Sequence, residues 1–115
     1  QCFNDVLGFR LHMEEYPTDF PEYFRVVDLR NGKVIDDGYR AIHLYYQRDN
    51  KAYPIDIQLW CGKHFQYNVW IHKHLYKYNS AEIGRKMYQL YCENQIHTEE
   101  EFLRKLEEVR SEIDG

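Results

Sequence analysis

Two neighbouring runs of alternating apolar and polar residues, residues 37–46 and residues 52–60, constrain the fold of this chain more than any other feature. Alternation with period two is typical of a β-strand that has one buried face. The residues that join the two runs, Gln47 to Lys51, are polar and of hairpin length. We therefore predict an antiparallel hairpin in which opposite residues share a face.

The hairpin would have one apolar face and one polar face. The residues of the apolar face are Ile42, Leu44, Tyr46, Ile55, Ile57 and Leu59. The residues of the other face are Tyr39, Ala41, His43, Tyr45, Asp56, Gln58 and Trp60. Burying a strand face that carries a carboxylate and an amide costs free energy, so we expect this face to be exposed to solvent or to bind a ligand.

The residues before the hairpin predict two more strands. β-Prone residues from Phe3 to Met13 predict the first strand, and residues 23–29 predict the second. The dipeptide Asn31-Gly32 is a strong hairpin turn signal, so residues 33–36 are expected to form a short return arm.

The residues after the hairpin change to helical spacing. Apolar residues recur at that spacing from Lys63 to Tyr78, which predicts a helix. Ser80 is expected to cap a second helix, and residues 98–101 read as a capping box that opens a third. Strands followed by helices predict an α+β fold.

Length and composition predict one domain, residues 1–115, strand-rich at 1–61 and helical at 62–115. The first residue is Gln and a strand-like run begins almost at once, so we interpret the chain as an excerpt of a longer protein. Three cysteines without CxxC spacing favour reduced thiols in a cytoplasmic protein. The sequence has no long apolar run and no signal peptide, so we do not expect a membrane partner. The net charge of -4 argues against binding to duplex DNA.

Asp5 and Asp56 are the sharpest pair of candidate functional residues. Two carboxylates on adjacent strands can hold Mg²⁺, which takes carboxylate and phosphate oxygens together and neutralises a transferring phosphoryl group. Asp5 and Arg10 are at odd spacing, so a bulge at Gly8 would bring them to one face. The alternative is that both acids are solvated residues at strand ends.

Aromatic and basic residues near these acids suggest contacts to a nucleotide. Tyr39 follows Gly38, which lets the backbone approach a ligand while the ring stacks on a base. His43 would contact phosphate or ribose. The basic residues that could bind phosphates are Arg10, Lys33, Arg40, Lys63, Lys73 and Lys77. The alternatives are half-buried strand side chains and a solvated, salt-bridged surface.

Taken together, four motifs in order resemble the synthetase domain of the RelA/SpoT family, the alarmone (p)ppGpp synthetases. The motifs are DVLGFR at 5–10, GYRAIH at 38–43, IDIQL at 55–59 and HLYK at 74–77. Each motif is weak alone, but four in order over residues 3–78 are fairly specific. The resemblance implies a nucleotidyltransferase-like fold, with a mixed, mostly antiparallel sheet and helices packed on it.

The resemblance also implies a function: transfer of pyrophosphate from ATP to the 3′-hydroxyl of GTP or GDP, with Mg²⁺ as cofactor, in stringent-response signalling. Asp5 and Asp56 would be the catalytic, metal-binding carboxylates, and Tyr39 would stack on the acceptor guanine. The other implied substrate contacts are Arg10, Arg40, His43, Gln58 and Lys77.

Three departures from the family pattern leave other functions open. Asp56 stands where the family has Glu, Trp60-Cys61 replaces an Arg-Thr pair, and residues 34–37 lack the Lys expected before the Gly-Tyr pair. One alternative is a degenerate, non-catalytic nucleotide-binding module. A second is a pyrophosphokinase that acts on a tRNA end. A third is an interaction domain whose last two helices bind a partner or a second copy, giving a homo-oligomer.

Overall fold

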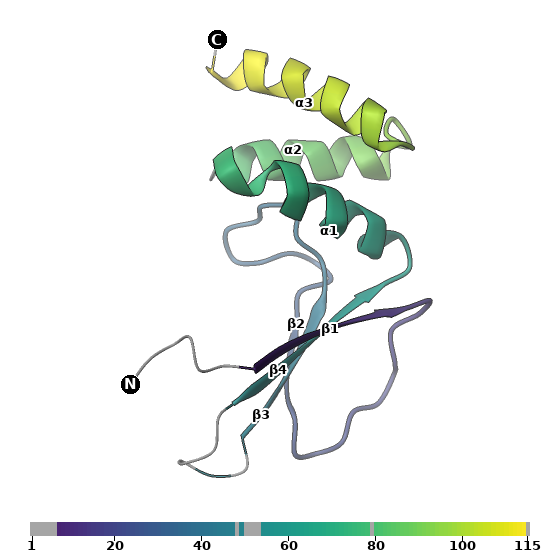
Figure 1. Ribbon diagram of the computed structural model, residues 1–115, viewed down its shortest axis with the longest axis vertical. Coiled ribbons are helices and arrows are strands. Elements are labelled where there is room, and N and C mark those ends of the chain that lie inside the picture. The colour runs from purple at the N-terminus through teal and green to yellow at the C-terminus, as the bar shows by residue number, and fades with distance from the viewer. Residues whose placement is uncertain (1–6, 48, 50–53, 79, 115) are drawn as a thin grey trace. The chain divides into compact units, whose positions relative to one another are not determined.

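The chain forms a four-stranded sheet followed by helices in a computed structural model that describes residues 7–47, 49, 54–78 and 80–114 (Figure 1). The strands are β1 (Leu7–Met13), β2 (Arg25–Asp28), β3 (Ile42–Tyr46) and β4 (Ile55–Cys61). The helices are α1 (Lys63–His74), the 3₁₀ helix η2 (Tyr76–Tyr78), α2 (Ala81–Cys92) and α3 (Glu99–Asp114). The predicted α+β class is confirmed.

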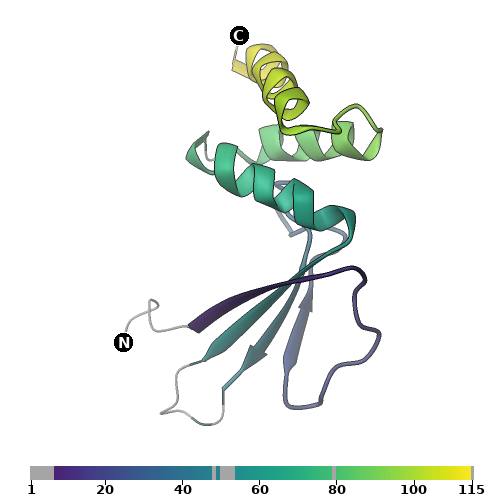
Figure 2. The same cartoon turned by 45° about the vertical axis from the view of Figure 1, so that its right-hand side comes forward.

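The sheet is mixed and has the strand order β1-β4-β3-β2. β3 and β4 form the predicted antiparallel hairpin, and β2 pairs antiparallel with the other side of β3. β1 lies along β4 and runs parallel to it (Figure 2). The expected mixed, mostly antiparallel sheet is therefore present.

One face of the sheet holds an apolar core. Its buried members are Ile42, Leu44, Leu59 and Cys61, and the side chains packed against them are Tyr16, Phe20, Phe24 and Ile57. The core follows from the alternation of the two hairpin strands, because Ile42 lies opposite Leu59 and Leu44 lies opposite Ile57. Burial of each large aliphatic side chain contributes about 1.5–3 kcal/mol.

The predicted return arm at residues 33–36 is wrong. These residues form no strand, and β2 pairs directly with β3. The carboxylates of Asp36 and Asp37 accept backbone N–H bonds from Gly38 (2.9 Å) and Tyr39 (3.1 Å). Such local side-chain turns compete with ladder pairing, so the Asn31-Gly32 signal opens a longer loop instead of a tight hairpin.

The predicted bulge at Gly8 is also wrong. The register of β1 against β4 runs without interruption, with Gly8 opposite Asp56 and Arg10 opposite Gln58. A Cβ built on Gly8 would meet nothing within 4 Å, so no close backbone approach requires this glycine. The part of the predicted first strand from residue 3 to residue 6, with Asp5, lies outside the described residues.

Both predicted helix caps are confirmed. The Ser80 hydroxyl accepts the Ile83 N–H at 3.3 Å, and the Thr98 hydroxyl accepts the Glu101 N–H at 3.1 Å. The carboxylate of Glu101 reaches back to the N–H of His97 at 2.7 Å, one residue before the cap. The first predicted helix ends at His74, earlier than expected, and η2 covers the last three residues of the predicted span.

The helices share a second apolar core. Its buried members are Tyr67, Trp70, Leu75, Ile83, Met87, Ile96, Phe102, Leu106 and Val109. The Tyr67 hydroxyl is buried as well, and it donates to the backbone carbonyl of Gly84 at 2.9 Å. The packed faces are formed by Ile83 and Met87 on α2 and by Phe102, Leu106 and Val109 on α3.

Contacts divide the chain into two units that interleave along the sequence. The sheet unit comprises Gln1–Asn31 and Arg40–Phe65, and the helical unit comprises Gly32–Tyr39 and Gln66–Gly115. Segment 32–39 belongs to the helical unit because its backbone packs on α2: a Cβ built on Gly84 would lie 1.9 Å from the carbonyl oxygen of Asp37. Among the described helices, none has the length and apolar character needed to cross a bilayer.

Candidate functional site

Three polar side chains converge on the face of the sheet opposite its apolar core. His43 comes from β3, and Asp56 and Gln58 come from β4. The antiparallel register sets Gln58 opposite His43, and Asp56 one pair further along the same face. His43 Nδ1 lies 3.1 Å from Asp56 Oδ1, and Gln58 Nε2 lies 3.4 Å from Asp56 Oδ2. We call these three residues the polar triad.

The tautomer of His43 follows from its contact with the carboxylate. An ionised carboxylate only accepts hydrogen bonds, so His43 must carry a proton on Nδ1 to donate to Asp56. The basic lone pair of a neutral His43 then lies on Nε2. The side chains of His43 and Asp56 are only 12% and 15% exposed, which strengthens this hydrogen bond relative to a bond in water.

Two further residues lie beside the polar triad, one on β3 and one on β2. The sequence analysis did not select them as site residues. The Tyr45 hydroxyl lies 3.2 Å from His43 Nδ1, and the Arg25 guanidinium lies 4.6 Å from the centre of the Tyr45 ring. Burial, followed by the nearby charge of Asp56, raises the pKa of Tyr45, so its hydroxyl stays neutral. The alternation of β3 already set Tyr45 beside His43, whereas the position of Arg25 depends on the β2–β3 register.

Arg10 stands on the polar face one strand away from the triad. It lies opposite Gln58 in the parallel β1–β4 pair, and its guanidinium stacks 3.9 Å from the ring centre of Trp60. Stacking on an aromatic face fixes a guanidinium without neutralising its charge. On this face, Arg10 of β1 and Arg25 of β2 supply guanidinium groups, Asp56 supplies a carboxylate and His43 supplies an imidazole.

The other residues singled out from the sequence are divided between the two units. Arg40 belongs to the sheet unit and is nearly fully buried, and its positive charge adds to burial and to the charge of Lys63 in lowering the pKa of His64. Tyr39 and Lys77 belong to the helical unit. There, the ammonium of Lys33 lies 5.3 Å from the Tyr39 ring centre and that of Lys77 lies 5.2 Å from the Tyr78 ring centre.

The fit of Mg²⁺ to this face depends on Asp56. No group of three or more His, Cys, Asp or Glu side chains that could hold a metal occurs among the residues that the structure describes. Asp56 supplies carboxylate oxygens, the donor type that Mg²⁺ takes, and Mg²⁺ is commonly held by one or two carboxylates together with substrate phosphates. Asp5, the expected second carboxylate, lies outside the described residues.

Comparison with known proteins assigns no family to the chain. No protein-family model matches the sequence, and no curated protein matches it significantly.

Proposed function

We propose that this chain is a nucleotide pyrophosphokinase domain of the RelA/SpoT kind, which uses Mg²⁺ and ATP to pyrophosphorylate the 3′-hydroxyl of GTP or GDP. The observation that carries the proposal is the polar triad of His43, Asp56 and Gln58, with Arg10 on the next strand. Two of the four motifs meet in the triad, and a third supplies Arg10.

Each residue has a role that its chemistry supports. Asp56, with Asp5, would hold Mg²⁺, which neutralises negative charge on the transferred group. His43 would orient the Asp56 carboxylate through its Nδ1–H and would contact the phosphate or ribose of a substrate. Arg10 would contact phosphate oxygens, and Gln58 would hold the second carboxylate oxygen of Asp56.

A second candidate function is nucleotide binding without turnover. It is favoured by the observation that both carboxylate oxygens of Asp56 already have side-chain partners within the protein. A shorter carboxylate with both oxygens engaged is displaced from the position that a Glu would give it, and displacements of about 1 Å can cost about 100-fold in rate.

The test is transfer of labelled phosphate by the full-length protein that contains this chain. Protein, Mg²⁺ and ATP labelled at the β or γ phosphate are incubated with GTP, GDP or bulk tRNA, and the products are separated. The proposal expects label on GTP or GDP. Label on tRNA alone would support the same transfer mechanism with tRNA as the acceptor.

The Asp56→Asn variant tests the role of the carboxylate. Transfer should fall about 100- to 1000-fold, because a preorganised charge at the reacting phosphates is lost. Asp19→Asn, in the exposed loop after β1, is the matched control and should keep full activity. Unchanged transfer by Asp56→Asn would contradict the proposal. If the folded wild-type protein transfers no label, calorimetric GTP binding that is indifferent to Mg²⁺ would support the binding module.

A further inference from the structure

Arg25, the first residue of β2, stands on the polar face of the sheet beside the polar triad. It lies opposite Tyr45 in the antiparallel β2–β3 pair, and Tyr45 lies opposite Asp56 in the β3–β4 pair. The guanidinium carbon of Arg25 lies 4.6 Å from the centre of the Tyr45 ring. A guanidinium that stacks on an aromatic face keeps its N–H donors at its edges, where they can bind another group.

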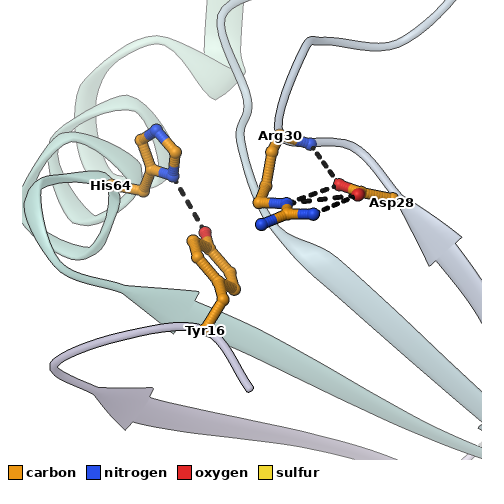
Figure 3. Close-up of polar contacts among 4 residues, drawn as sticks. All are labelled: Tyr16, Asp28, Arg30 and His64. Atoms are coloured by element: carbon orange, nitrogen blue, oxygen red, sulfur yellow. Dashed lines mark hydrogen bonds and ion pairs between the residues drawn. The ribbon is translucent and has the colours of Figure 1, made fainter. Parts of the chain in front are cut away.

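The positive charge of Arg25 has no ion-pair partner among the residues that the structure describes. The acid of the same strand, Asp28, is held by Arg30 instead. Arg30 donates to the Asp28 carboxylate through Nε (3.0 and 3.1 Å) and Nη2 (2.7 Å), as Figure 3 shows. This hydrogen bonding holds the pKa of Asp28 below its usual range. The Asp56 carboxylate is bonded within the polar triad. A bound anion could therefore pair with Arg25.

The Tyr45 hydroxyl supplies a second donor beside Arg25. Because His43 carries its proton on Nδ1, the Tyr45 oxygen, 3.2 Å away, can only accept in that contact. The proton of the Tyr45 hydroxyl is not used there, and none of the described residues accepts it. Burial, followed by the charge of Asp56, raises the pKa of Tyr45, so the hydroxyl keeps this proton at neutral pH.

Arg10, the other arginine of the polar face, is too distant to share one phosphate group with Arg25. Arg10 stacks 3.9 Å from the ring centre of Trp60. Trp60 lies four residues further along β4 than Asp56, the residue opposite Tyr45. At about 3.3 Å per residue, the two aromatic rings are about 13 Å apart along the strands. A phosphate group bound by Arg25 would therefore differ from any that Arg10 contacts.

We propose that Arg25 and Tyr45 form an anion subsite beside the polar triad, which binds one phosphate group. A guanidinium fork and a neutral hydroxyl both donate, and phosphate oxygens accept such bonds strongly. The chain carries a net charge of -4, so general attraction of anions would not explain binding there. The group can belong to inorganic phosphate, to pyrophosphate or to a nucleotide. The subsite requires binding alone, so it does not depend on the proposed transfer of pyrophosphate.

The Nε–H group of Arg25 provides a test at the subsite itself. Its NMR signal, assigned by its loss in Arg25→Gln, is followed in the full-length protein that contains this chain. Phosphate, pyrophosphate or GTP is added without Mg²⁺, with sodium chloride keeping the ionic strength constant. We expect a saturable shift of the signal. A shift with all three ligands indicates a site for any phosphate group, and a shift with GTP alone indicates a nucleotide phosphate. No saturable shift with any of them overturns the proposal.

The Tyr45→Phe variant tests the second donor. It keeps the ring on which Arg25 stacks and removes only the hydroxyl. Binding of pyrophosphate and of GTP, followed through the same signal, should weaken about 3- to 10-fold. Arg104→Gln, an exposed arginine of α3 in the helical unit, changes the net charge alone and should bind as the wild type. Unchanged affinity in Tyr45→Phe, or an equal loss in Arg104→Gln, would overturn the subsite.

Discussion

His64 sits at the start of α1 with its Nδ1 bonded to the Tyr16 hydroxyl, and its pKa is lowered to about 4 by burial and by three nearby cations. In the unfolded chain the imidazole returns to its ordinary pKa of 6.5. As the pH falls from 6.5 towards 4, His64 therefore becomes protonated in the unfolded chain before it does so in the folded protein. The contribution of His64 to stability is complete above pH 6.5 and is lost as the pH falls towards 4.

The full shift corresponds to about 3 kcal/mol, but the imidazole is only partly buried and solvent screens its interactions, so we expect about 1–2 kcal/mol of acid destabilisation in that window. Urea unfolding at a series of pH values measures it. His64→Gln should remove this part of the pH dependence, and His72→Gln, an exposed histidine of the same helix, should retain it. An identical pH dependence in wild type and His64→Gln would show that His64 titrates normally in the folded protein.

Residue by residue, the sequence predicts contacts within a hairpin better than contacts between distant strands. His43, Asp56 and Gln58 could be grouped from alternation alone, because their strands are neighbours along the chain. Tyr16 and His64 are 48 residues apart, and their contact depends on the parallel pairing of β1 with β4. Alternation fixes which residues share a face but does not fix which strands pair.

Among the elements, the start of α3 is the clearest case of local chemistry that sets a boundary. The Thr98 hydroxyl satisfies the Glu101 N–H, which has no partner within the helix. Thr98→Ala should lower the free energy of unfolding by about 1 kcal/mol, measured by chemical denaturation. Ser111→Ala, at an exposed position near the other end of α3, should change it by less than about 0.5 kcal/mol. Equal effects of the two substitutions would contradict a capping role.

Element prediction failed where two local signals competed. Asn31-Gly32 favours a tight hairpin, yet the aspartates at 36 and 37 bond the backbone two residues on, and segment 32–39 packs on α2. The turn signal was local, and the packing that overrode it involves Gly84, far along the chain. The boundaries that sequence did predict well, at Ser80 and Thr98, depend only on neighbouring residues.

At the scale of the whole molecule, the two units alternate along the sequence, and within the helical unit segment 32–39 meets α2 at Gly84. A methyl group at Gly84 would overlap the Asp37 carbonyl, which is backbone and cannot rotate away. Gly84→Ala should therefore destabilise the protein by at least about 2 kcal/mol, although alanine favours helices. The measurement is thermal or urea unfolding.

Gly8→Ala is the matched control for this substitution. Gly8 has open space around its Cβ position, so the change should be neutral or stabilise slightly, by up to about 1 kcal/mol. A mild effect at Gly84 would mean that segment 32–39 can leave α2 at little cost. A severe effect at Gly8 would reveal a requirement for glycine that the continuous β1–β4 register does not show.

The strand order also has a consequence for synthesis on the ribosome. β1 is the first described strand to be made, yet its partner β4 is the last, and β2 and β3 are made between them. At translation rates of about 5–20 residues per second, β1 remains unpaired for several seconds until β4 has been synthesised. Phe9, Leu11 and Met13, which are exposed even in the folded sheet, are accessible throughout that interval. Nascent β1 is thus a natural target for chaperones that bind short apolar segments as they leave the exit tunnel.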